Sequence, residues 1–167
     1  MEIRSIDSFI GYYENLRERT SRLIREVPRD HLEWSYKEEK FTIGDVIRHI
    51  AAIERFMFAE NILGRPSRYN GCSRALADGY DAVVAFFNRM HDETIAMLKG
   101  LSVDDLQEKC VTPSGVPITK WKWLRAMAEH EVHHRGELYI YLNLVGVKTP
   151  PMFGLTSEEV QARSVKD

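Results

Sequence analysis

The sequence has few cysteines: Cys72 and Cys110 are the only two among its 167 residues. Two thiols are too few to build the disulfide framework that stabilises many small secreted domains. Long apolar runs are also missing, because none approaches the roughly 20 residues that a membrane-spanning helix requires. The N-terminal residues do not combine a basic start with an apolar segment, so they do not predict a signal peptide. From these absences we expect a cytoplasmic protein that does not enter a membrane.

An excess of positive charge is absent as well. The 23 lysines and arginines are balanced by 25 aspartates and glutamates, and the formal net charge is −2. This balance gives no electrostatic reason to expect a nucleic-acid partner, and no basic run predicts binding to an anionic membrane. A hydrophobic share of 44% and a charged share of 29% are typical of a globular protein. We expect one domain over residues 1–167, which is long enough to bury a sizeable core.

Apolar residues recur at helical spacing in four segments, and this pattern predicts four long amphipathic helices. Pro28 ends the first helix, and Gly64, Gly100 and Gly146 mark the ends of the others. Between the second and third helices, residues 65–74 have the composition of a loop and are numerous enough to cross the end of a bundle. The four helical segments are 7–27, 42–63, 76 or 81–99, and 119–146.

The remaining sequence adds little regular structure. Residues 110–117 are too rich in turn residues to be helical, and no segment gives a convincing set of strands. After two prolines, Thr156 or Ser157 begins a last short helix. The sequence therefore predicts an all-α fold, a four-helix bundle with a short extra helix at the C-terminus.

Three of the six histidines lie within five residues of the last long helix, at positions 130, 133 and 134. His130 and His134 are four residues apart, so their Cβ atoms lie about 5–6 Å apart on one helix face. Both interrupt an apolar line, and this spacing lets two imidazoles bind one metal ion. His49 is the only histidine elsewhere that falls inside an apolar stripe. We therefore predict an inward-facing site of His49, His130 and His134, with coordination positions left open for water or substrate.

Two other interpretations of the histidines compete with this one. Each imidazole can be a core side chain that is hydrogen-bonded to a carbonyl or a carboxylate. Alternatively, the letters HEVHH match the H-E-x-x-H helix of zinc metalloproteases, with Glu131 as the general base. The extended protease motif requires glycine and histidine where this sequence has Glu137 and Ile140, and such proteases need a sheet-containing domain. We therefore favour the metal site over the protease.

The segment HEVHHRGELYIYL, with a histidine in the earlier segment DVIRHIAAIERF and with PPMFGLTSEEV after it, resembles the DinB-like (damage-inducible, YfiT-like) family of metalloproteins. The resemblance covers most of the chain. It implies a four-helix bundle with a long crossover between the second and third helices, usually dimeric. It also implies a divalent metal, zinc or nickel, held by His49, His130 and His134. His133 is then a neighbour of the ligands.

One position departs from the family pattern. The residue after HHRG is usually glutamine in the family, and here it is Glu137. A carboxylate at this position can orient a ligand imidazole or bind the cation itself, and it cannot donate a hydrogen bond as an amide does. A surface position or a salt bridge for Glu137 is an equal alternative. Whether Glu137, His133 or His91 joins the site stays open at this point.

The resemblance also implies an activity. We expect a metal-dependent enzyme that adds a low-molecular-weight thiol, such as glutathione, mycothiol or bacillithiol, to an electrophilic small-molecule substrate, or a hydrolase with the same centre. The alternatives are a non-catalytic metal-binding stress-response protein and a purely structural bundle. A second apolar strip on the last long helix, through Trp121, Leu124, Ala128 and Val132, slightly favours a homodimer over packing by loops.

Overall fold

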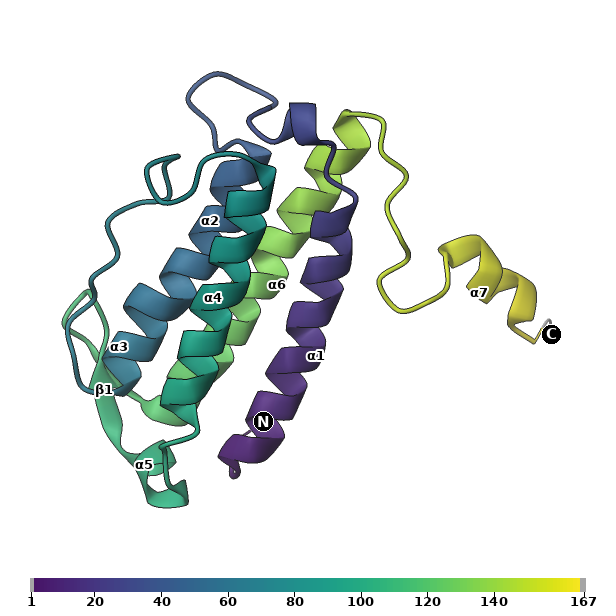
Figure 1. The fold of residues 1–167 in the computed structure, drawn as a ribbon. Helices are drawn as coiled ribbons and strands as arrows, with labels where there is room; N and C mark the ends of the chain where they lie inside the picture. The colour runs from purple at the N-terminus through teal and green to yellow at the C-terminus, as the bar shows by residue number, and fades with distance from the viewer. Residues whose placement is uncertain (1, 166–167) are drawn as a thin grey trace.

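The computed structural model describes residues 2–165, which form a bundle of four long helices (Figure 1). The prediction of an all-α four-helix bundle is confirmed. The first long helix is α1 (Ile6–Arg25), the third is α4 (Tyr80–Leu98) and the fourth is α6 (Lys120–Leu144). The second consists of α2 (Ile43–Ile53), the π-helical segment η2 (Glu54–Phe58) and α3 (Ala59–Ile62). The short elements are η1 (Arg29–His31), α5 (Val103–Gln107), β1 (Lys109–Val111), β2 (Pro117–Thr119) and α7 (Ser157–Arg163).

Residues 63–79 form the long crossover between the second and third long helices. This segment starts at α3 and returns along the bundle to the end where α2 begins, so α2 and α4 run in the same direction (Figure 1). The crossover that the family resemblance implied is therefore present. The third long helix begins at Tyr80, close to the later of its two predicted starts.

Local sequence explains the ends of the helix that carries His49. The Thr42 side chain accepts a hydrogen bond from the Asp45 backbone N–H, and the Asp45 carboxylate accepts one from the Thr42 backbone, which is a capping box. Gly64 follows the end of this helix with a φ of 74°, a conformation that side chains with a Cβ rarely adopt. Gly146 ends α6 with a φ of 80°. These ends were predicted from the sequence.

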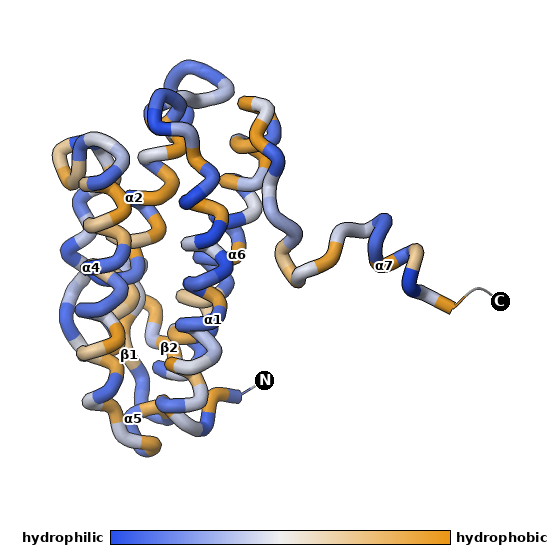
Figure 2. The backbone as a smooth tube through the Cα atoms, turned by 45° about the vertical axis from the view of Figure 1, so that its right-hand side comes forward, coloured by the Kyte–Doolittle hydropathy of each residue, from blue (hydrophilic) through white to orange (hydrophobic). Residues whose placement is uncertain are grey.

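The structure corrects two expectations. Residues 109–111 and 117–119 pair as an antiparallel hairpin, β1 with β2, just before α6, whereas the sequence predicted no strands. The second apolar strip of α6 is also not a continuous surface, because Leu124 and Ala128 are buried inside the bundle while Val132 is exposed. Figure 2 shows hydrophobic and hydrophilic stretches alternating along the bundle helices, as expected of amphipathic helices. None of the helices described over residues 2–165 is long and apolar enough to cross a membrane.

A cluster of charged and polar side chains from all four long helices lies in the middle of the core. Arg17 of α1 forms ion pairs with Glu54 of η2 and with Glu131 of α6, the latter at 3.3 Å. Thr20 of α1 donates a hydrogen bond of 2.6 Å to Glu131, and His91 of α4 contacts Glu54 at 2.9 Å. All five side chains are buried. Buried charges cost free energy unless their partners are in place, so the cluster restricts how the helices pack.

We expect Arg17→Met to lower the free energy of unfolding by about 3–5 kcal/mol, because it leaves two buried carboxylates without their cation. Urea denaturation measures the change. Arg25→Met is the matched control on the same helix, since Arg25 forms an exposed pair with Glu18 at 2.8 Å. Such a pair contributes at most about 1 kcal/mol. Equal losses in the two variants would show that the cluster does not stabilise the bundle.

Candidate metal centre

Three imidazoles meet where α2 packs against α6. His49 comes from α2, and His130 and His134 come from successive turns of α6. The Nε2 atoms of His49 and His130 are 3.1 Å apart, and one ring nitrogen of each histidine lies within 4.8 Å of the others. Two nitrogens bound to one tetrahedral ion at about 2.0–2.1 Å lie about 3.3 Å apart. The structure thus brings together the three predicted residues in an arrangement that fits a divalent cation.

The histidines lie at the edge of the buried face of α6. The apolar line that the sequence predicts for this helix also passes through Met127, Leu138 and Tyr141, which are buried. The two histidines on that line are only half-buried. The buried face of α6 includes Leu124, Met127, Ala128, Glu131, Arg135, Leu138, Tyr141 and Leu142. The predicted core line is therefore correct at Met127, Leu138 and Tyr141, and the histidines lie at its edge. The edge position gives the imidazoles a route to solvent that a deep core position would not.

Two of the three imidazoles are bonded on the side that faces away from the centre. His134 Nδ1 is 2.9 Å from the Glu137 carboxylate, and His49 Nδ1 is 2.8 Å from the Tyr69 hydroxyl. A carboxylate only accepts hydrogen bonds, so His134 Nδ1 is the donor and the lone pair of the neutral ring is on Nε2. Groups of this kind orient metal-binding histidines in known metalloproteins. Glu137 therefore lies behind a histidine rather than among the converging nitrogens.

Burial keeps two of the histidines uncharged. Together with the smaller effect of the neighbouring His134, burial lowers the pKa of His49 to about 4 and the pKa of His130 to about 3. Metal ions bind the neutral form of imidazole, so these two histidines are available as ligands at neutral pH without loss of a proton. The electrostatics of the pair suit a cation.

Aromatic side chains lie beside two of the three histidines. The Phe41 and Tyr69 rings lie 5.3 and 5.6 Å from His49, and the Phe58 ring lies 5.8 Å from His130, between ring centroids. Such rings bring few competing hydrogen-bonding groups to the centre. They also lower the local dielectric constant, which strengthens the interaction of any bound ion with its ligands.

The structure separates the other candidate residues from this group. Glu131, the general base of a protease interpretation, is buried in the ionic cluster of the core. His91 contacts Glu54 in the same cluster, and burial lowers its pKa to about 3. His133 is exposed, with its ring 4.9 Å from that of His134. Within residues 2–165, the histidine, cysteine and carboxylate side chains that converge in this way are those of the three predicted residues alone.

The two cysteines are buried, and burial raises the pKa of both thiols. A raised pKa makes a thiolate scarce at neutral pH, which does not suit a nucleophile. Tyr69 was not a candidate in the sequence, because it lies in the crossover, 20 positions from His49, outside any periodic pattern. No signal in the sequence alone would have found it.

Comparison with known proteins finds a matching protein family and similar solved structures. A sequence model of the DinB superfamily matches residues 12–138, which include His49, His130 and His134. The uncharacterized protein YjoA of Bacillus subtilis is 20% identical over 151 residues, which are 88% of this chain and 95% of YjoA. The crystal structure of this DinB-like protein is similar, with a TM-score of 0.70 over 87% of this chain and 96% of that one.

Two further solved structures share the fold. YfiT of Bacillus subtilis, described as a probable metal-dependent hydrolase with an unusual four-helix bundle topology, has a TM-score of 0.70 at 15% identity. The similarity covers 89% of this chain and 91% of YfiT. A mycothiol-dependent maleylpyruvate isomerase has a TM-score of 0.57 at 17% identity, over 80% of this chain and 60% of the isomerase chain. At these identities the similarity establishes the fold.

We expect the metal-free protein to become less stable as the pH falls below about 6.5. The lowered pKa values keep His49 and His130 neutral in the folded chain, while the unfolded chain takes up protons near the ordinary histidine pKa of 6.5. The unfolded state then binds more protons, so the free energy of unfolding is highest above pH 6.5 and decreases from pH 6.5 down to about 3.

Urea denaturation of metal-free protein at several pH values in this window tests the expectation. The double variant His49→Gln, His130→Gln should lose less stability on acidification than the wild type does. His91 remains in both proteins and contributes a shared decrease, because its pKa is also lowered by burial. Identical pH dependences in the two proteins would contradict the assignment.

Proposed function

The chain belongs to the DinB superfamily, and on that premise we propose that it is a metal-dependent enzyme in which His49, His130 and His134 hold a divalent cation. The observation that carries the proposal is the convergence of one nitrogen from each of these imidazoles. Hydrogen bonds to Glu137 and Tyr69 on the opposite ring nitrogens support it. Imidazole ligands suit zinc and nickel, which are the ions we propose.

The donor set favours a reactive ion over a structural one. Structural zinc sites are almost always closed by four protein ligands, whereas catalytic sites have three and an open position. Among residues 2–165, the convergent group has three members. When bound, a divalent cation with three neutral ligands supplies positive charge that favours the deprotonated form of a water or thiol. This distinction favours an enzyme over a non-catalytic metal-binding stress protein.

We propose that a low-molecular-weight thiol is the nucleophile and that a small electrophile is its partner. Support comes from a structural neighbour that is described as mycothiol-dependent. The chain's own residues hold and orient the centre: Glu137 keeps the proton of His134 on Nδ1, and the buried Phe58 ring lies beside His130. Hydrolysis is the second candidate, because YfiT is described as a probable metal-dependent hydrolase.

Elemental analysis of protein purified without added metal is the first test. We expect about one zinc or nickel ion per chain in the wild type. The triple variant His49→Ala, His130→Ala, His134→Ala should lose the ion and remain folded by circular dichroism. His133→Ala is the matched control, because this histidine belongs to the same turn of α6 and its side chain is exposed. Equal metal content in the wild type and the triple variant would contradict the proposed site.

Reaction of a thiol panel with 1-chloro-2,4-dinitrobenzene is the second test. Sulfur displaces chloride from the ring: one C–S bond forms, one C–Cl bond breaks, and the thiol proton passes to solvent. We expect at least one of glutathione, mycothiol and bacillithiol to react faster with the metal-loaded protein than without it. His134→Ala should lower kcat/KM by about 100-fold or more, and His133→Ala should not. Hydrolysis of aryl esters without thiol turnover would instead support the hydrolase.

A further inference from the structure

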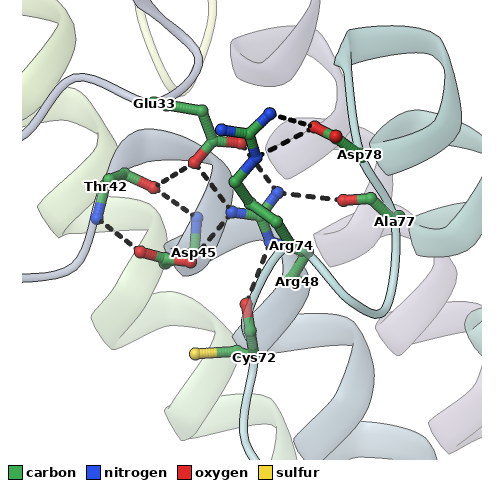
Figure 3. A network of polar contacts seen from close by, with 8 residues as sticks. All are labelled: Glu33, Thr42, Asp45, Arg48, Cys72, Arg74, Ala77 and Asp78. Carbon is green, nitrogen blue, oxygen red and sulfur yellow. Dashed lines mark hydrogen bonds and ion pairs between the residues drawn. The ribbon is translucent and has the colours of Figure 1, made fainter.

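A buried arginine fastens the crossover to the helix that carries His49. Arg48 is fully buried, and its Nε donates to the Cys72 carbonyl at 2.9 Å while one Nη donates to the Ala77 carbonyl at 3.1 Å (Figure 3). The Glu33 carboxylate accepts from both Nη atoms at 2.9 Å, and Asp45 accepts at 2.8 Å. All nitrogens of the guanidinium are thus bonded. We call Arg48, Glu33, Asp45 and the two carbonyls the crossover clamp.

The clamp fixes the chain close to Tyr69. Tyr69 lies three positions before Cys72, whose backbone carbonyl is one of the two that accept hydrogen bonds from Arg48. On the other side of Tyr69, the Arg68 backbone N–H donates to the Phe56 carbonyl at 2.7 Å, and the Ser67 hydroxyl donates to the same carbonyl at 3.3 Å. The backbone around Tyr69 is therefore attached at both sides to the second long helix, which also carries His49.

The attached backbone determines where the Tyr69 side chain reaches. Its hydroxyl is 2.8 Å from His49 Nδ1, and the two rings are nearly perpendicular, with 5.6 Å between their centroids. A phenol oxygen can accept the Nδ1 proton of His49 and donate its own proton elsewhere. The geometry is that of a support behind a metal ligand.

We propose that Tyr69 is a positioning residue of the metal centre and that the crossover clamp holds it in place. By accepting the Nδ1 proton, Tyr69 keeps the Nε2 lone pair of His49 directed toward His130 and His134 and restricts rotation of the ring. Glu137 does the same for His134 from within α6, whereas Tyr69 acts from a loop. The crossover is thereby a functional part of the site. This inference rests on the proposed metal site.

Zinc affinity, measured by competition with a chromophoric chelator, tests the role of the hydroxyl. Tyr69→Phe keeps the ring and removes the oxygen, and we expect zinc to bind about 10-fold more weakly. The visible absorption bands of the cobalt-substituted protein should shift, because His49 is no longer held. The control is Tyr80→Phe, since the Tyr80 hydroxyl donates to the Ile24 carbonyl outside the site. Wild-type affinity and an unchanged cobalt spectrum in Tyr69→Phe would overturn the proposal.

Gly44 gives a way to disturb the clamp without touching the metal centre. A Cβ at this position would lie 3.1 Å from both Nη atoms of Arg48 and 3.0 Å from Glu33, which is closer than ordinary contact. Gly44→Ala therefore displaces the guanidinium or its partner. Gly11→Ala is the matched control, because a Cβ there meets no heavy atom within 4 Å.

We expect Gly44→Ala to weaken zinc binding when Tyr69 is present and to add nothing in the Tyr69→Phe background, because both changes act through one hydroxyl. Glu33→Gln, which removes the charge that faces Arg48, replaces Gly44→Ala if that variant does not fold. Equal and additive losses in both backgrounds would show that the clamp does not act through Tyr69. If the triple histidine variant binds zinc as the wild type does, the metal site itself is wrong, and this outcome is separate from the others.

Discussion

The bundle depends on charges that are held away from water at its centre. Arg17 contacts carboxylates from the second and fourth long helices, and the residues that carry them are about 1% exposed. Such charges are tolerated only when their partners are in place, so each helix is restricted in its rotation as well as in its position. A rotation by one residue, about 100°, would withdraw a carboxylate from the cluster. The core therefore fixes which face each helix presents to its neighbours.

This restriction explains how one short stretch of α6 serves both the core and the site. Because Glu131 points to the ionic cluster, His130 and His134 lie on the adjacent face and are directed toward α2, where His49 meets them. There the two histidines are half-buried. Burial lowers the pKa of His130 enough to keep its imidazole uncharged, and the remaining exposure leaves the site accessible to a small molecule. The segment that matches the H-E-x-x-H motif thus contains Glu131, a structural acid of the core, and the candidate metal ligands His130 and His134.

Local rules were sufficient for much of this arrangement. The end of the second long helix at Gly64 and the pairing of His130 with His134 are determined within one or two helical turns, so the sequence predicts them. Tyr69 and Glu131 could not be placed in this way. The first depends on loop carbonyls that bind a distant arginine, and the second on charges from other helices, so neither has a signal among its sequence neighbours. The β1–β2 hairpin likewise depends on pairing between two strands, and a strand of three residues is too short to show a recognisable pattern in the sequence.

The π-helical segment η2 gives the second long helix a place where its length can change. A π-helical turn contains one more residue than the α-helical turn it replaces, so the helix on either side keeps the face that it presents. His49 lies before this turn, Ile62 lies after it, and Glu54 reaches the core from within it. From positions only five residues apart, the second long helix thus presents His49 to the metal centre and Glu54 to the ionic cluster.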